Sequence, residues 1–168
     1  MKKIFLIGYM GAGKSRLGKQ LAEALNLPFI DSDAQIEQKE GKNITEIFRT
    51  KGEAYFREEE VEFVRELAMK DAFVCATGGG LPCFHNLMQK LNKIGTTIYL
   101  KNSTETLVKR LQNETDKRPK LADLSSEELA EFISKAVKER ESVYNMAHFS
   151  LNENEQTTEK MRSILLNG

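Results

Sequence analysis

The chain has 168 residues, which is enough for one domain with a sizeable apolar core. Its 25 lysines and arginines balance its 25 aspartates and glutamates, which excludes bulk attraction to nucleic acid or to an anionic membrane. Its 2 cysteines are too few for a disulfide framework, and no apolar stretch reaches the ~20 residues that cross a bilayer. We therefore expect a single cytoplasmic domain over residues 1–168.

Short apolar runs recur along the chain and predict β-strands. Runs of this kind are typical of strands buried on both faces, as in a parallel sheet. Phe149 and Leu151 predict a last strand near the C-terminus. The four clearer runs cover residues 4–7, 28–30, 73–76 and 97–100.

Between these strands, apolar residues recur at the spacing of an α-helix. Ser125, followed three residues later by Glu128, predicts a capping box at the start of one helix. Alternating strands and helices indicate the α/β class: a three-layer α/β/α domain around a mainly parallel, five-stranded sheet. The helical positions are Leu17, Leu21 and Leu25; Phe56, Phe63, Val64 and Leu67; Leu107, Val108 and Leu111; Leu129, Phe132, Ile133, Ala136 and Val137; and Met161, Ile164 and Leu165.

Residues 8–15, GYMGAGKS, have the G-x-x-x-x-G-K-S spacing of a P-loop and stand between a predicted strand and a predicted helix. The glycines let backbone N–H groups turn toward a phosphate, and the helix N-terminus adds its positive dipole end. Lys14 can reach the β- and γ-phosphates, and the Ser15 hydroxyl suits Mg²⁺. A glycine-rich turn without a ligand is the alternative. A switch GTPase is disfavoured, because Gly95 stands where the base-reading motif needs aspartate.

Two carboxylates, Asp31 and Asp33, follow the second apolar run. Residues two apart leave a strand on the same side, so both side chains are expected in one pocket at the carboxyl edge of the sheet. Phosphoryl transfer needs an acidic group near Mg²⁺ and a second one to hold the attacking hydroxyl. Capping of a helix that begins near Ala34 is the alternative role.

Glycines and arginines supply the remaining candidates. Three glycines at 78–80 follow another buried run and would allow a ligand to approach bare backbone. Arg140 falls on the apolar face of its helix, where a guanidinium needs an anionic ligand or a core carboxylate. Arg57 and Arg118, taken alone, would be ordinary surface charges. Residues 113–125 are polar and are the best candidate for a mobile loop.

In this order, the stretches GYMGAGKS, DSD, GEAYFRE, TGGG, KRP and RESVY resemble the shikimate kinase family, small P-loop kinases with a nucleoside-monophosphate-kinase-like fold. The resemblance covers the whole chain. It implies a monomer that uses Mg²⁺ and transfers the γ-phosphate of ATP to the 3-hydroxyl of shikimate, on the route to aromatic amino acids. The alternatives are another small-molecule kinase of this fold, such as a gluconate kinase, and a catalytically silent nucleotide-binding module.

The resemblance also implies regions and roles. It places the P-loop at 8–15, the shikimate-binding region at about 32–60 and a lid at about 112–124, with Glu60 similar to a pocket acid that orients an arginine. The implied nucleotide contacts are Gly11, Ala12, Gly13, Lys14, Ser15, Arg16, Arg110 and Arg118; the metal contacts are Ser15 and Asp31; the shikimate contacts are Asp33, Arg57, Gly78, Gly79, Gly80 and Arg140; the catalytic residues are Lys14, Asp33 and Arg118.

Three departures from the family pattern are visible. Arg16 stands where many members have threonine, and Lys120 stands where leucine often follows Arg-Pro. Residues 152–158 lie in the region that contacts adenine in the family, but they show no clear counterpart residue. None of these departures removes a group that the implied chemistry requires.

Overall fold

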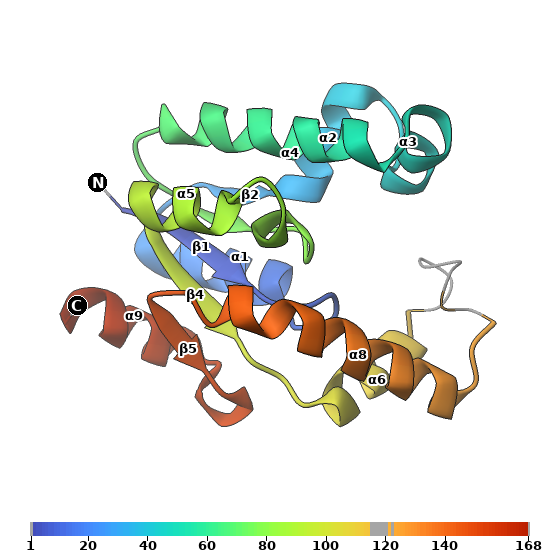
Figure 1. Ribbon diagram of the computed structural model, residues 1–168. Coiled ribbons are helices and arrows are strands. Elements are labelled where there is room, and N and C mark those ends of the chain that lie inside the picture. Colours follow the sequence, from blue (N-terminus) through green and yellow to red (C-terminus); the bar gives the residue numbers. More distant parts are fainter. Residues whose placement is uncertain (1, 115–120, 122, 168) are drawn as a thin grey trace.

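The computed structural model describes residues 2–114, 121 and 123–167. Over these residues the chain forms a parallel five-stranded sheet with the order β2-β3-β1-β4-β5 (Figure 1). This confirms the expected class and every predicted strand, with shifts of about one residue at the ends. The strands are β1 (Lys3–Ile7), β2 (Phe29–Asp31), β3 (Phe73–Ala76), β4 (Thr96–Leu100) and β5 (Phe149–Leu151).

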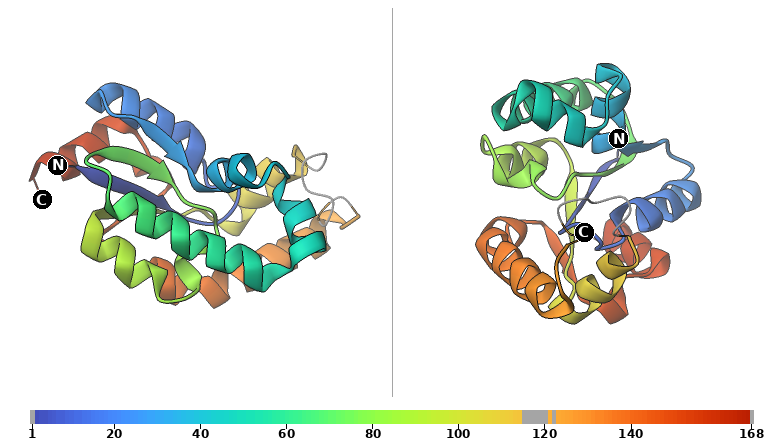
Figure 2. Two further views of the ribbon diagram at one scale, coloured as in Figure 1. Left: turned by 90° about the horizontal axis from the view of Figure 1, so that it is seen from above. Right: turned by 90° about the vertical axis from the view of Figure 1, so that its right-hand side faces the viewer.

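Helices cover both faces of the sheet. Helices α1 (Lys14–Leu25) and α9 (Thr158–Asn167) lie on one face, and α4 (Glu53–Ala68), α5 (Leu87–Ile94) and α8 (Ser126–Tyr144) lie on the other (Figure 2). The central strands are therefore enclosed on both sides, which explains why residues 73–76 of β3 are all buried. The predicted three-layer arrangement is confirmed. No helix in the described part of the chain is long and apolar enough to cross a membrane.

All five strands point the same way, so their carboxyl ends meet at one edge of the sheet. The P-loop follows β1, Asp31 ends β2, and the three glycines follow β3. Helix α6 (Thr104–Gln112) begins shortly after β4, with Ser103 as its N-cap. Ligands of open α/β sheets bind outside this edge, so the topology gathers the candidate residues where a site is expected.

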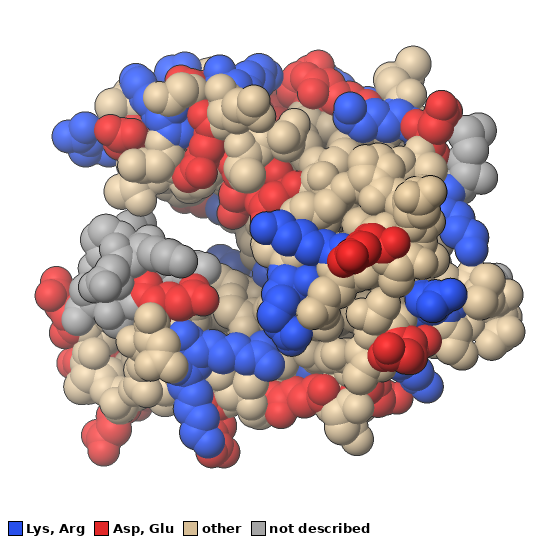
Figure 3. Space-filling view, turned by 180° about the vertical axis from the view of Figure 1, so that it is seen from behind, with Lys and Arg blue, Asp and Glu red and all other residues tan. Residues whose placement is uncertain are grey.

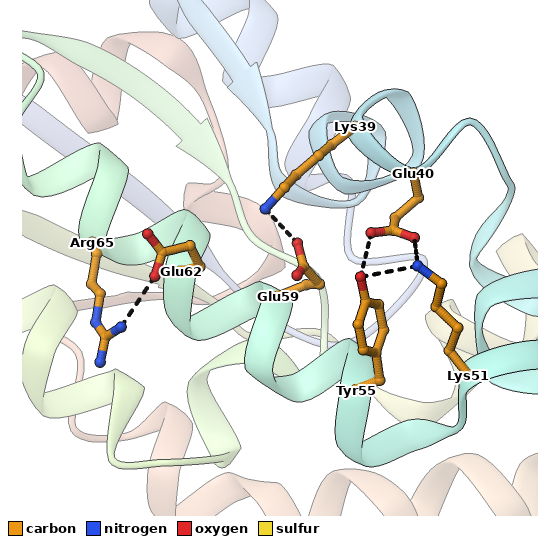
Figure 4. A network of polar contacts seen from close by, with 7 residues as sticks. All are labelled: Lys39, Glu40, Lys51, Tyr55, Glu59, Glu62 and Arg65. Atoms are coloured by element: carbon orange, nitrogen blue, oxygen red, sulfur yellow. Dashed lines mark hydrogen bonds and ion pairs between the residues drawn. The ribbon is translucent and has the colours of Figure 1, made fainter.

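Helices α2 (Ser32–Glu40) and α3 (Ile44–Lys51) form a small unit with the beginning of α4. Ile36, Ile47 and Phe56 make an apolar cluster there, separate from the main core. Polar contacts brace the same helices (Figure 4): Lys39 pairs with Glu59, and Glu40 contacts both Lys51 and the Tyr55 hydroxyl, all between 2.6 and 2.7 Å. These contacts fix the first turns of α4 above the sheet edge.

The structure adds two helices that the sequence analysis did not predict and corrects the expected burial of one side chain. The sequence pattern did not indicate α3 or α5, because each helix has only 8 residues and a short apolar stripe. Phe132 was expected on the buried face of α8, but its side chain is 48% exposed, whereas Leu129 and Ile133 are buried. Phe132 stands at a helical spacing from the other apolar residues of α8, but the face of α8 that packs against the protein does not extend to it.

The capping box of α8 should contribute measurably to stability, because this helix carries Arg140. Ser125 Oγ accepts from the Glu128 N–H at 3.2 Å, and the Ser125 N–H donates to Glu128 at 2.8 Å. We expect Ser125→Ala to lower the free energy of unfolding by about 1 kcal/mol, measured by denaturant titration. The control is Ser134→Ala, at an exposed position within the same helix, which should cause no loss. Equal effects of both substitutions would contradict the assigned cap.

Candidate active site

The loop after β1 has the geometry of a phosphate cradle. Gly11 and Gly13 have φ values of +80° and +90°, which only glycine adopts without strain. Helix α1 begins directly at Lys14, and no side chain caps its N-terminus. The N–H groups of its first turn are therefore available for an anion. The Lys14 ammonium donates to the carbonyl oxygens of Gly8 at 2.8 Å and Tyr9 at 2.7 Å, so it lies across this loop.

Asp31, at the end of β2, is hydrogen-bonded to the P-loop. Its Oδ2 accepts from the Ser15 hydroxyl at 2.6 Å, and its Oδ1 accepts from the Ala34 N–H at 3.3 Å as the N-cap of α2. The capping role and the expected position beside Ser15 therefore occur together. Helix α2 begins at Ser32, so the strand argument for Asp33 was wrong: Asp33 stands in the first turn of a helix. Both carboxylates nevertheless line one cleft.

The pair of Ser15 and Asp31 fits a Mg²⁺ site, since both offer oxygen ligands within hydrogen-bonding distance of each other. Within the described ranges, no group of three or more His, Cys, Asp or Glu side chains could hold a metal without other ligands. A few protein oxygens completed by phosphate and water are the usual environment of Mg²⁺ in phosphoryl-transfer sites.

The three glycines after β3 leave room for the protein's own side chains. A Cβ at Gly78 would lie 2.5 Å from Oδ1 of Asp33. A Cβ at Gly80 would lie 2.9 Å from both Nη1 and Nη2 of Arg57, although φ −87° and ψ −21° at Gly80 suit any residue. A side chain at either glycine would displace Asp33 or Arg57, because the ends of these two side chains lie against the glycine backbone.

Arg57 is not the exposed helix charge that its neighbours in the sequence suggest, because its side chain is only 11% exposed. Its Nη1 donates to Glu60 at 2.7 Å, while Nε and Nη2 donate to Glu53 at 3.3 and 3.1 Å. Glu60 is 1% exposed. Burial raises the pKa of Glu60 from its ordinary value of 4.5 to about 7, although the charge and hydrogen bond of Arg57 lower it.

Arg140 reaches the same cleft from α8. Its guanidinium lies 5.4 Å from the centre of the Tyr9 ring, and no carboxylate in the described part of the chain pairs with it. The neighbouring Tyr144 is fully buried, and its hydroxyl donates to the Gly79 carbonyl at 2.6 Å. The alternative role of Arg140, a salt bridge to a core carboxylate, is thus not seen among the described residues. A partly buried cation without a carboxylate partner suits an anionic ligand.

These residues meet in a cleft of about 550 Å³, visible in Figure 3 as a hollow with Lys and Arg side chains at its inner end. Sequence reasoning missed several of the lining residues, because most of them are apolar side chains that no motif marks and that reach the cleft only through the fold. The predicted residues along it are Gly11, Gly13, Lys14, Ser15, Arg16, Asp31, Asp33, Arg57, Glu60, Gly78, Gly79, Gly80 and Arg140; those not named as site residues are Met10, Ile44, Phe48, Phe56, Thr77 and Glu114.

Two of the predicted nucleotide contacts in the described part of the chain, Ala12 and Arg110, are not among the residues that line this cleft. Ala12, within the P-loop, is 1% exposed, so its side chain is not part of the cleft surface. Arg110 of α6 donates to the Gly11 carbonyl at 3.0 Å and so lies against the P-loop. Arg118, with most of the expected lid, lies outside the described residues. In the region expected at adenine, Gln156 donates to the carbonyls of Lys101 and Leu151, which ties the chain after β4 to the chain after β5.

The raised pKa of Glu60 predicts a pH-dependent stability. Between pH 4.5 and about 7 the folded chain holds a proton that the unfolded chain has released. The free energy of unfolding should therefore fall with rising pH across this window, by up to about 3 kcal/mol from this group. Glu60→Gln should lack that component. The measurement is denaturant unfolding of both proteins from pH 4.5 to 8, and a difference between them that stays constant with pH would contradict the assignment.

Comparison with known proteins adds an independent line of evidence. The family model described as shikimate kinase matches residues 10–167. The shikimate kinase of Azobacteroides pseudotrichonymphae is 47% identical over 148 residues, covering 88% of this chain and 87% of that protein. The crystal structure of shikimate kinase from Bacteroides thetaiotaomicron superposes with a TM-score of 0.94 at 38% identity, covering 98% of both chains.

A further structure, shikimate kinase from Acinetobacter baumannii in complex with shikimate, has a TM-score of 0.85 at 32% identity and covers 99% of this chain and 92% of that one. The identities, the coverage and the fold agree. The chain belongs to the shikimate kinase family.

Proposed function

We propose that this chain transfers the γ-phosphoryl group of ATP to the 3-hydroxyl of shikimate, giving shikimate 3-phosphate and ADP. The observation that carries the proposal is one cleft that combines a phosphate cradle with two arginines and a carboxylate. The cradle suits a nucleotide, whereas the arginines suit a small acceptor that bears a carboxylate. Both halves are needed for transfer, because the acceptor hydroxyl must approach the phosphorus in line.

The nucleotide half stands on the P-loop and α1. Backbone N–H groups of residues 11–15 would hold the phosphates, and the Lys14 ammonium would exchange its carbonyl partners for phosphate oxygens. Ser15 and Asp31 would hold Mg²⁺, which supplies positive charge to the phosphate oxygens when bound. Arg16, Arg110 and the lid residue Arg118 complete the proposed nucleotide contacts.

The acceptor half stands on α2, α4, α8 and the turn after β3. Arg57 and Arg140 would bind the carboxylate of shikimate, and the backbone at 78–80 would border its ring. Asp33 would accept a hydrogen bond from the 3-hydroxyl, orient its oxygen toward the phosphorus and take its proton as the new bond forms. Arg140 brings a guanidinium that pairs with no carboxylate in the described part of the chain, which favours acids over neutral polyols.

We propose that the chain acts as a monomer in the cytoplasm, as its resemblance to the family implies. A gluconate kinase remains the alternative to be tested, since gluconate also carries a carboxylate. Gluconate is an open-chain molecule, however, whereas shikimate presents its hydroxyls from a ring.

The test offers ATP with several acceptors in turn: shikimate, its neutral carboxamide, gluconate and nucleoside monophosphates. We expect efficient phosphorylation of shikimate, with the carboxamide poorer by roughly 30-fold or more in kcat/KM, because one partner of a desolvated charge pair is missing. The control for contaminating kinases is Lys14→Ala, which should lower turnover by roughly two to four orders of magnitude. Equal use of shikimate and the carboxamide would contradict the arginine roles, and preferred use of gluconate would contradict the proposed acceptor.

A further inference from the structure

An aromatic ring stacks on Arg57 from outside the substrate cleft. The Cζ atom of Arg57 lies 3.9 Å from the centre of the Phe84 ring, compared with 5.4 Å for Phe56 and 6.0 Å for Phe48. At 3.9 Å the ring and the guanidinium are in van der Waals contact, well inside the range of cation–π attraction. Phe84 does not line the cleft, so it contacts the arginine without belonging to the substrate surface.

Phe84 is also not a core residue. It is half-buried, and it packs against neither of the two apolar clusters in the described part of the chain. Its neighbour Cys83, in contrast, packs against the main cluster. Burial of apolar surface therefore does not explain why a phenylalanine stands at position 84, whereas the contact with Arg57 does.

The backbone that follows Phe84 is strained. His85 and Asn86 have φ values of +50° and +55°, two successive left-handed residues that are not glycine. Asn86 precedes α5 as its N-cap but makes no side-chain capping bond. The strain is thus not offset by a cap. The turn does bring the extended residue Phe84 onto Arg57 before α5 begins at Leu87.

Two kinds of contact, hydrogen bonds and the Phe84 ring, restrict the orientation of the Arg57 guanidinium. Glu53 and Glu60 accept hydrogen bonds from three of its nitrogens, which fixes the direction of the guanidinium. Hydrogen bonds along the edge still allow the plane to tilt, because they tolerate a broad range of angles. A ring stacked on one face opposes this tilt and leaves the terminal edge of the guanidinium facing the bare backbone of Gly80.

We propose that Phe84 is a positioning residue: it fixes the plane of the Arg57 guanidinium so that its fork meets the carboxylate of the acceptor. This inference rests on the proposed function, in which Arg57 binds that carboxylate. Phe84 itself touches no substrate. Its effect must therefore pass through Arg57 and be confined to acceptors that carry a carboxylate.

The experiment compares Phe84→Leu, which keeps an apolar side chain without a ring, with Phe84→Tyr, which keeps the ring. For Phe84→Leu we expect the KM for shikimate to rise about two- to thirtyfold, the range that a cation–π contact spans. The KM for ATP and the kcat/KM for the neutral carboxamide should stay within about twofold. Phe84→Tyr should resemble the wild type. Phe132→Leu, at an exposed phenylalanine of α8, is the matched control and should change none of these constants.

A second arm tests the route through Arg57. In an Arg57→Lys background, Phe84→Leu should have little further effect on the KM for shikimate, because a lysine offers no planar fork to be oriented. Effects that multiply independently would overturn the proposal, as would an equal loss toward shikimate and the carboxamide. Should Phe84→Leu fail to fold in a thermal scan, Phe84→Met replaces it as the variant without a ring.

The outcome for the wild type separates this inference from the proposed function. A wild type that prefers shikimate, together with a Phe84→Leu variant that is unchanged, overturns the role of Phe84 alone. A wild type that phosphorylates the carboxamide as well as shikimate overturns the proposed function and the role of Phe84 together.

Discussion

The ion pair between Arg57 and Glu60 is the contact on which the acceptor side of the cleft depends. Glu60 is 1% exposed and meets Arg57 at 2.7 Å, and removing two such charges from water costs more than a pair of apolar side chains would. Glu53 gives the guanidinium a second hydrogen-bonding partner, and the Phe84 ring lies against it. A cation held in this way loses little conformational entropy when an anion binds, which explains how a costly buried pair can serve binding rather than stability.

Backbone groups form most of one half of the cleft, and side chains form most of the other. The phosphate side is largely backbone, since the glycine loop after β1 and the start of α1 present N–H groups, and Lys14 adds a charge held by two carbonyl oxygens. The acceptor side is made of side chains on α2, α4 and α8, braced by the apolar cluster around Ile47 and by the contacts of Glu40. The parallel sheet brings both to one edge. In the proposed function, a general phosphate cradle faces the side chains that would select the acceptor.

The sequence predicts well what depends on local pattern and poorly what depends on tertiary contact. The P-loop, the strands and the cap at Ser125 are local features, and the structure has all of them. The burial of Arg57 and the exposure of Phe132 depend on which helix faces lie against neighbours, which periodicity does not determine. Asp33 reached the cleft by a helical turn and not by strand alternation. The reason for glycine at 78 and 80 is a contact with side chains distant in the sequence, so only the structure reveals it.

The central claim is that bare backbone at Gly80 lets the Arg57 guanidinium occupy the position in the cleft from which it would bind the acceptor's carboxylate. Gly80→Ala tests it most directly, because the backbone at this position suits alanine while the added Cβ would lie 2.9 Å from both terminal nitrogens of Arg57. The measurement is the KM for shikimate and for ATP, with thermal unfolding as a check on folding. We predict a KM for shikimate at least about tenfold higher, because displaced binding groups are costly, with the KM for ATP and the unfolding temperature nearly unchanged. A folded Gly80→Ala variant with an unchanged KM for shikimate would contradict the account.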